Sequence, residues 1–275
     1  MMCGFDRTPP TAAEVATARR AYYAAISYID DHVGRILSRL EELGLAEDTV
    51  VVVTSDHGDM LGERGLWYTM SPFERSARVP LIVRGPERWV RPGRYTRPVT
   101  LLDLMPTLCE LAGTPVEEDP EAVASGRLGR SLLATARREA AGEGDDTERD
   151  VRIEYLAEGT HHPQLTLVRS RHKLVVCPGD PDLLFDVEAD PHELTDLAED
   201  PGHAGLRESM RADLATRYDL AALEREVPAS QERRTLVAGA LSRGRRRAWD
   251  LVPDAEQRYV RGDFWDALGY GRIPG

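Results

Sequence analysis

An acidic residue and a histidine stand side by side in the segment Thr54 to Met60, which reads TSDHGDM. The β-branched run TVVVVT at residues 49–54 leads into them, and such a run is typical of a parallel strand that is covered on both faces. In open α/β sheets, ligands bind beyond the carboxyl ends of the strands, which is where Asp56 and His57 would lie. A carboxylate oxygen and an imidazole nitrogen there can both face one divalent cation.

A hard cation such as Ca²⁺ or Mg²⁺ would need further oxygen ligands from elsewhere in the fold. Gly58 gives the turn the freedom to point both side chains at the ion. The Asp-His-Gly triplet alone leaves a second interpretation open, because Asp and His also cap helices and turns in many proteins.

The elements around this segment indicate an α/β fold. Thr11 to Leu43 predicts one long helix, because Thr11 and Glu14 form a capping box, apolar residues recur at helical spacing, and Gly44 follows. The segment RVPLIVR at residues 78–84 predicts a second buried strand, and LLDLMPTLCELA at residues 101–112 predicts a helix. Helix, strand, loop, strand and helix in this order predict α/β layering, with the helix face packed on a core.

The second half of the chain has shorter elements. An acidic, Gly-rich and Arg-rich stretch up to about Asp150 indicates an exposed connection and a domain boundary. Four short strands at residues 151–156, 165–169, 172–177 and 183–186 predict a small antiparallel sheet. Helices are expected at residues 205–223 and 231–249. We therefore expect three parts, at residues 1–150, 151–225 and 226–275.

Composition excludes some partners. The chain of 275 residues carries a net charge of -12, with 41% hydrophobic and 30% charged residues, as in an ordinary globular protein. An acidic chain does not favour nucleic acid or an anionic membrane as partner. The short RGRRR cluster at residues 243–247 is interpreted as a solvated helix end. Three cysteines without CxxC spacing, and no signal segment, favour a cytoplasmic protein.

The longer segment TSDHGDMLGERGLWYTMSPFERSARVPLIV, at residues 54–83, resembles the metal-binding strand and loop of type I sulfatases in the alkaline-phosphatase superfamily. Residues 101–108 and 183–197 resemble later stretches of the same family. Residues 232–250 and 254–266 resemble the carboxy-terminal extension of the choline sulfatases, and residues 2–11 resemble a segment that precedes the metal-binding strand. The resemblance therefore runs through nearly the whole chain.

This resemblance implies the carboxy-terminal part of an α/β/α sandwich followed by a smaller antiparallel sheet. It also implies a sulfuric ester hydrolase in which a formylglycine hydrate attacks the sulfur beside a divalent cation. Ca²⁺ is the first candidate for that cation, and Mg²⁺ or Mn²⁺ are alternatives. Asp56 and His57 carry over as two metal ligands, whereas Asp59 matches no ligand and is expected to orient its neighbours.

The sequence departs from the family pattern at two places. The family nucleophile lies in a Cys/Ser-x-Pro/Ala-x-Arg segment, and no such segment occurs in these 275 residues; Cys3 and Arg7 have the spacing, but Phe5 stands between them. Thr69 occupies the position of a family lysine that contacts the sulfate, so Arg64, Arg75 or Arg78 would supply the charge, and a guanidinium is not an equivalent point charge.

The stretch IEYLAEG resembles the region from which choline sulfatases offer a carboxylate to a quaternary ammonium group. Glu154 and Glu158 are therefore candidate substrate ligands, with Tyr155 as an aromatic neighbour. The alternative is that the two glutamates lie on the solvated face of a strand. The aromatic tail residues Phe264 and Trp265 are expected to pack on a neighbouring surface or subunit.

Three functions remain open: a choline-sulfate hydrolase, a non-catalytic remnant or one half of a split sulfatase, and a phosphonate monoester or phosphodiester hydrolase. The expected partners are choline sulfate and either a second copy or an amino-terminal partner chain. We expect the isolated chain to be inactive, because it supplies no nucleophile, and sparingly soluble, because its sheet would have an unpaired apolar edge.

Overall fold

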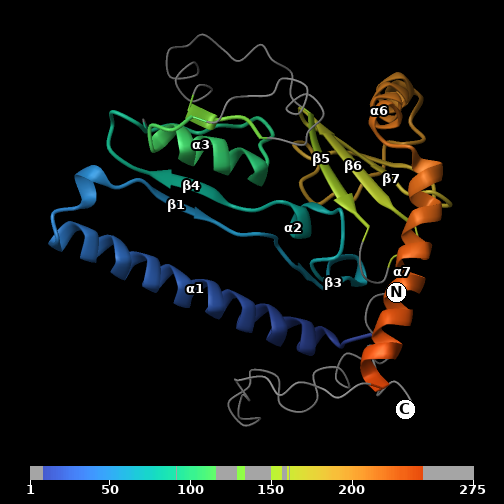
Figure 1. The fold of residues 1–275 in the computed structure, drawn as a ribbon, viewed down its shortest axis with the longest axis horizontal. Coiled ribbons are helices and arrows are strands. Elements are labelled where there is room, and N and C mark those ends of the chain that lie inside the picture. The colour runs from blue at the N-terminus through green and yellow to red at the C-terminus, as the bar shows by residue number, and fades with distance from the viewer. Residues whose placement is uncertain are drawn as a thin grey trace.

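The computed structural model describes residues 9–90, 92–115, 129–133, 150–156, 160 and 162–243, and every structural statement below concerns these residues. Helices and strands alternate through the first part of the chain, and helices follow a four-stranded sheet in the second (Figure 1), which confirms the α/β class. The elements in chain order are α1 (Ala12–Glu42), η1 (Ala46–Asp48), β1 (Val51–Thr54), β2 (Met60–Leu61), η2 (Glu63–Gly65), β3 (Trp67–Tyr68), α2 (Glu74–Ala77), β4 (Leu81–Arg84), η3 (Leu101–Asp103), α3 (Leu104–Leu111), β5 (Asp150–Tyr155), β6 (Gln164–Arg169), β7 (His172–Val176), β8 (Leu183–Asp186), η4 (Pro201–His203), α6 (Ala204–Arg217) and α7 (Leu220–Arg243).

The first helix begins and ends as its sequence predicts. The Thr11 side chain accepts from the Glu14 N–H at 3.3 Å, and the Glu14 carboxylate accepts from the Thr11 N–H at 2.8 Å, so both halves of the capping box are present. The helix ends at Leu43, after which Gly44 adopts φ +68, a left-handed conformation that favours glycine.

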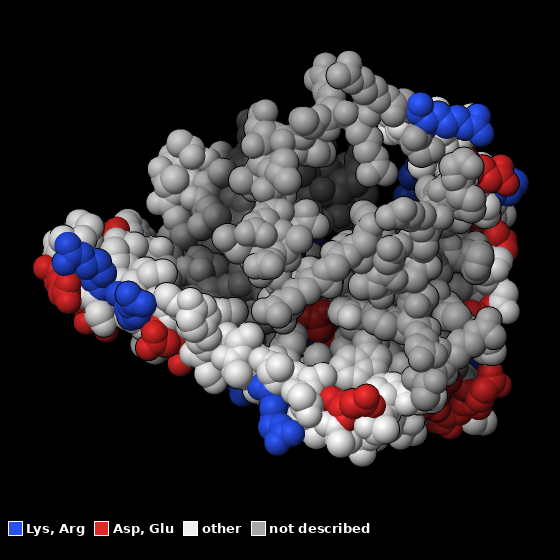
Figure 2. Space-filling view, turned by 90° about the horizontal axis from the view of Figure 1, so that it is seen from below, with Lys and Arg blue, Asp and Glu red and all other residues white. Residues whose placement is uncertain are grey.

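The long helix α1 is held to the rest of the fold near its two ends. Arg19 donates to the Leu61 carbonyl at 2.9 Å near the start, and Arg84 pairs with Glu41 at 3.0 Å near the end. Between these contacts no α1 residue is buried, and Ile29 and Ile36 are each 59% exposed. Figure 2 shows white, uncharged surface on this side of the molecule between clusters of charged residues. The apolar face expected to pack on a core is therefore uncovered in this structure.

Strands β1 and β4 pair antiparallel, with Val51 opposite Arg84 and Thr54 opposite Leu81. The expectation of buried parallel strands is wrong for this pair: three of the four β1 residues are half-buried, and Ile82 is 61% exposed. The segment between them, which contains β2, β3 and the four-residue helix α2, turns the chain back, so β4 runs against β1. A β-branched run indicates a strand but does not indicate the direction of its partner.

The four-stranded sheet β5-β6-β7-β8 is antiparallel throughout, which confirms the four strands predicted beyond Asp150. Its residues alternate between two faces. One face, with Leu167, Leu174 and Leu184, packs against Met210 and Leu214 of α6. The other face carries Thr166, Lys173 and Phe185, which are buried as well. The sheet is therefore covered on both sides.

The carboxy-terminal helices differ from the prediction. Helix α6 ends at Arg217, and α7 starts at Leu220 and continues through Pro228 to Arg243. Asp219 restarts the helix, because its carboxylate accepts from the Ala222 N–H at 2.9 Å. The predicted break before Gln231 is wrong, and Phe264 and Trp265 lie outside the described residues. Within the described chain, no helix combines the length and apolar composition that a membrane span requires.

We predict that the purified chain self-associates through the exposed apolar residues of α1, because uncovered apolar surface of this kind favours association. Light scattering after size exclusion should give a mass above that of one chain. The double variant Ile29→Glu/Ile36→Glu should shift the mass toward the monomer. The control Ser27→Glu/Ser38→Glu adds the same charge to exposed polar positions and should leave the association unchanged. A monomeric wild-type chain with a cooperative thermal transition would contradict the prediction.

Candidate metal site at the end of β1

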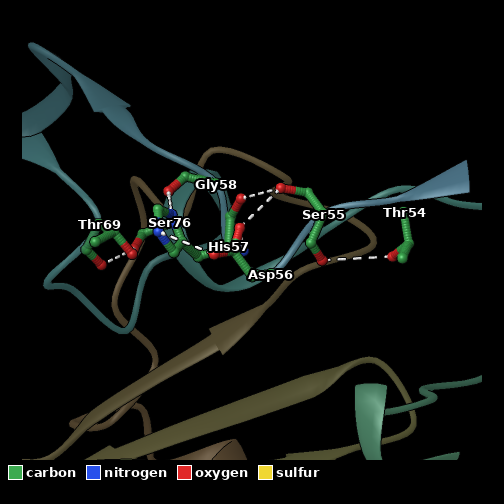
Figure 3. A network of polar contacts seen from close by, with 7 residues as sticks. All are labelled: Thr54, Ser55, Asp56, His57, Gly58, Thr69 and Ser76. Carbon is green, nitrogen blue, oxygen red and sulfur yellow. Dashed lines mark hydrogen bonds and ion pairs between the residues drawn. The ribbon is translucent and has the colours of Figure 1, made fainter. Parts of the chain in front are cut away.

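The loop that follows β1 is tied to the rest of the fold at two points, and Figure 3 shows the second of them, between Gly58 and Ser76. The Thr54 hydroxyl donates to the Pro80 carbonyl at 2.8 Å, which fixes the end of the strand. The Gly58 N–H donates to the Ser76 carbonyl of α2 at 2.8 Å. The intervening residues Asp56 and His57 are therefore held between a strand end and a short helix.

Gly58 is required by the closeness of α2. A Cβ atom on Gly58 would lie 2.2 Å from the Arg75 carbonyl oxygen, closer than real Cβ contacts occur. Gly58 is not among the glycines with positive φ, so the turn itself does not demand a glycine. The glycine predicted to free the turn instead allows two backbone segments to touch.

The side chains of Asp56 and His57 face solvent on the same side of the loop. They are 84% and 47% exposed, and His57 Nε2 lies 3.6 Å from Asp56 Oδ2. Two ligands of one ion are about 3 Å apart when each lies about 2.0–2.6 Å from it. A small rotation of either side chain therefore suffices for both to reach one cation.

The local hydrogen bonds favour metal binding by the Asp56 carboxylate and by His57 Nε2. The pKa of the Asp56 carboxyl lies below its usual value, first because the His57 N–H donates to it at 2.9 Å, so the group is an anion at neutral pH. His57 Nδ1 lies 3.0 Å from the Gly58 carbonyl. A proton on Nδ1 would donate to that carbonyl and leave Nε2 with a free lone pair for a metal.

The described residues supply only part of a metal site. No group of three or more His, Cys, Asp or Glu side chains able to hold a metal gathers anywhere in the described part of the chain. A hard ion such as Ca²⁺ takes six to eight oxygen ligands. Asp56 and His57 thus fit as two ligands of an ion whose other ligands come from elsewhere.

Ser76 is a residue of this site that the sequence analysis missed. It is buried at 2% exposure, and while its carbonyl accepts from Gly58, its hydroxyl donates to the Thr69 carbonyl. Thr69 therefore reaches the Asp56 loop through Ser76. The Thr69 carbonyl, rather than the Thr69 side chain, makes the main contact with Ser76. No sequence signal distinguishes Ser76, because serines are common in loops.

The three arginines considered as replacements for a lysine at Thr69 are placed differently. The Arg64 guanidinium lies 4.3 Å from the Phe73 ring centroid, and that of Arg78 lies 3.7 Å from Glu74. Arg75 is exposed, and its carbonyl is the one that touches Gly58. The Arg75 guanidinium lies 3.4 Å from His192 Nδ1, so the contact of its carbonyl with Gly58 does not place its charge at the loop.

Of the two candidate substrate ligands, Glu154 lies within the described residues and Glu158 does not. Glu154 is exposed on β5 and accepts from the Tyr218 hydroxyl at 2.6 Å. Burial first, and then this hydrogen bond, raise the pKa of Tyr218. Glu158 lies outside the described residues. Glu154 therefore has a defined partner at the end of α6, and its role as a substrate ligand stays a prediction.

Comparison with known proteins identifies the family. The sulfatase family matches residues 4–114, the family described as N-sulphoglucosamine sulphohydrolase, C-terminal, matches residues 62–219, and the family described as Choline sulfatase enzyme C terminal matches residues 225–270. Together these matches run from one end of the described chain to the other. Sulfatases are generally metal-dependent.

Individual relatives agree with this assignment. The choline-sulfatase of Rhizobium meliloti (strain 1021) is 40% identical over 266 residues, which are 95% of this chain and 50% of that protein. The phosphonate monoester hydrolase SpPMH of Silicibacter pomeroyi is 31% identical with a TM-score of 0.58, over 84% of this chain and 44% of that one. The Bacteroides fragilis protein yidJ, assigned to the sulfatases, is 25% identical with a TM-score of 0.61, over 82% and 48%.

The chain thus spans about half the length of the relatives that it matches. Its solved neighbours have the alkaline-phosphatase-like fold, which confirms the fold expected from the resemblance. The match to the sulfatase family, at residues 4–114, includes the segment that carries Asp56 and His57 together with α2. The chain belongs to the sulfatase family.

Proposed function

We propose that this chain forms the carboxy-terminal portion of a sulfuric ester hydrolase that acts on choline sulfate. The observation that carries the proposal is the side-by-side placement of the Asp56 carboxylate and the His57 Nε2 atom in a chain 40% identical to a choline-sulfatase. The match of residues 225–270 to the choline-sulfatase carboxy-terminal family supports the same substrate. In this proposal residues 1–150 belong to the catalytic α/β domain, 151–225 form the small sheet and 226–275 the extension.

The chain's own residues would bind and orient a divalent cation. Ca²⁺ is the first candidate, with Mg²⁺ or Mn²⁺ as alternatives, because a carboxylate and an imidazole suit all three. When bound, the cation neutralises charge on the sulfate oxygens. Asp56 and His57 hold it from one side, Gly58 lets their loop rest on α2, and Arg64, Arg75 or Arg78 is proposed to add positive charge in place of the lysine that Thr69 replaces.

Glu154 and Glu158 are proposed to face the quaternary ammonium of choline. The contact between Glu154 and the Tyr218 hydroxyl supports an aromatic neighbour for that group, because a cation without hydrogen-bond donors is stabilised by carboxylates and ring faces. The chain is proposed to be cytoplasmic, where thiols stay reduced. Cys109 and Cys177 are free, and burial raises the pKa of the Cys177 thiol to about 11, which makes it unreactive.

The nucleophile and the remaining metal ligands are proposed to come from residues outside these 275, either in a longer form of the same polypeptide or in a partner chain. The 275 residues contain no Cys/Ser-x-Pro/Ala-x-Arg segment, and the chain covers 50% of the choline-sulfatase that it matches. The exposed apolar residues of α1 fit a polypeptide that carries the other half of a sulfatase, or a second copy of this chain. The alternative proposal is a non-catalytic remnant.

A second candidate function is hydrolysis of phosphonate monoesters or phosphodiesters. The observation in its favour is the 31% identity to the phosphonate monoester hydrolase of Silicibacter pomeroyi over 84% of this chain. The greater identity and coverage of the choline-sulfatase favour the sulfate ester. Parallel assays with choline sulfate and a phenyl phosphonate ester on a complete complex would separate the two functions.

We predict that the isolated chain binds Mn²⁺ through Asp56 and His57. Titration followed by electron paramagnetic resonance should show weaker binding in Asp56→Ala and in His57→Ala, by about ten- to a hundredfold for the loss of one of few ligands. Asp31→Asn is the control, because it removes one carboxylate charge at an exposed position of α1 and should bind as the wild type. Equal affinity in all four proteins would contradict the assignment of the two ligands.

We predict that Gly58→Ala displaces the loop from α2. The added Cβ would meet the Arg75 carbonyl, and relief of that clash should lower the free energy of unfolding by about 1–3 kcal/mol. Denaturant unfolding measures this change. Gly34→Ala is the control, because nothing lies within 4 Å of its Cβ, and in a helix it should stabilise by about 0.5–1 kcal/mol. A Gly58→Ala variant as stable as the wild type would show that the loop does not rest on α2.

We predict that the isolated chain releases no sulfate from choline sulfate with Ca²⁺, Mg²⁺ or Mn²⁺, because no residue supplies the nucleophile. The Rhizobium meliloti choline-sulfatase is the positive control for the assay. Sulfate release by this chain that disappears in Asp56→Ala would contradict the proposal that residues outside the chain supply the nucleophile. Release that persists in Asp56→Ala would point to a contaminating enzyme.

A further inference from the structure

Lys173 is the only lysine in the chain, and it is fully buried in β7. It lies on the face of the small sheet opposite the α6 core, next to Phe185 of β8. Its Nζ atom is 2.9 Å from Glu74 Oε1 and 2.5 Å from Glu193 Oε1. A buried ammonium needs such partners, because an unpaired buried charge is strongly unfavourable.

The Lys173 ion cluster joins three separate segments. Glu74 starts α2, Lys173 lies in β7, and Glu193 lies in the loop after β8. The second carboxylate oxygen of Glu193 accepts from the Glu74 N–H at 2.7 Å, so Glu193 binds both the ammonium and the backbone of α2. Arg78 lies 3.7 Å from the other oxygen of Glu74 and balances the charge of the cluster.

Two further observations indicate that this junction is held firmly. Glu193 has φ +55, a left-handed conformation that a residue with a side chain keeps only when its surroundings enforce it. The Phe73 ring, which precedes α2, packs against the Phe185 ring with centroids 6.1 Å apart. The ion cluster and the ring pair thus fix the start of α2 against the small sheet.

The position of α2 in turn sets the position of the Asp56 loop. The Ser76 carbonyl accepts the Gly58 N–H, and the Arg75 carbonyl occupies the space that a Cβ on Gly58 would need. A shift of α2 would therefore move or release Gly58 together with the neighbouring Asp56 and His57.

We propose that Lys173 is a positioning residue for the Asp56-His57 site, and that it acts through Glu74 and α2. The small sheet then helps to set the geometry of the Asp56-His57 site, although the proposal assigns it no metal ligand. The claim that Lys173 fixes the position of the loop stands independently. The claim that Lys173 affects cation binding rests on the proposed function.

The test compares two substitutions at adjacent positions of β7. Lys173→Met keeps most of the side-chain volume and removes the charge that orders Glu74. Leu174→Ala is the matched control, because it opens a cavity in the core on the opposite face of the same strand. Both should lower the melting temperature, but only Lys173→Met breaks the link to α2.

Hydrogen exchange followed by mass spectrometry reads the loop directly, without a metal. In Lys173→Met, peptides covering residues 54–61 and 69–78 should exchange about tenfold faster or more, whereas in Leu174→Ala they should exchange as in the wild type. Should Lys173→Met fail to fold, Glu74→Gln tests the same link from the other side and should show the same local change. Unchanged exchange in the loop, or an equal increase in Leu174→Ala, would overturn the proposal.

Mn²⁺ affinity, measured on the same samples, separates the two proposals. We expect Lys173→Met to bind Mn²⁺ about ten- to a hundredfold more weakly than Leu174→Ala does. If the wild type binds no Mn²⁺ while the exchange difference is present, the metal assignment fails and the positioning role stands. If the wild type binds Mn²⁺ and Lys173→Met neither weakens it nor loosens the loop, the positioning role fails alone.

Discussion

The structure of the candidate site depends on the contact between Gly58 and α2. The loop after β1 would be free to swing as an exposed turn if only Thr54 tied it to the fold. The hydrogen bond from Gly58 to the Ser76 carbonyl removes that freedom, and the absence of a side chain lets the Arg75 carbonyl come within contact distance. Asp56 and His57 gain a fixed direction from this backbone contact.

The support for α2 comes from a part of the chain that is distant in sequence. The two-faced sheet β5-β8 buries leucines against α6 on one side, and presents Lys173 and Phe185 to α2 on the other. A four-residue helix has little stability of its own, so its position must be set by such tertiary contacts. The charged cluster costs desolvation energy, and its ion pairs and hydrogen bonds join α2 to β7 and to the loop after β8.

Much of this could be predicted from local sequence signals. The capping box of Thr11 and Glu14 and the glycine at 44 defined α1, and alternation with tight turns defined the small sheet. The pairing direction of β1 and β4 was predicted wrongly, because β-branched runs look alike in parallel and antiparallel strands. Asp219 moved the start of α7 to Leu220, whereas a helix was expected to begin at Gln231.

Within the site, the adjacency of Asp56 and His57 was visible in the sequence, because both candidate metal ligands belong to one segment. The reason that position 58 needs a glycine was not visible in the sequence, because it depends on the Arg75 carbonyl, which only the fold brings near. Lys173 gave a signal that could have been used: a single lysine inside the apolar strand HKLVV must be either exposed or paired when buried. Its partners Glu74 and Glu193 come from other segments, so only the structure shows which case holds.

The central claim is that Asp56 and His57 are two ligands of one divalent cation. The most direct measurement is the anomalous scattering of Mn²⁺ in crystals of the chain grown with a polypeptide carrying the other half of a sulfatase. We predict one peak within about 2.0–2.6 Å of an Asp56 carboxylate oxygen and of His57 Nε2. A peak bound by other residues, with Asp56 and His57 both facing solvent, would contradict the claim.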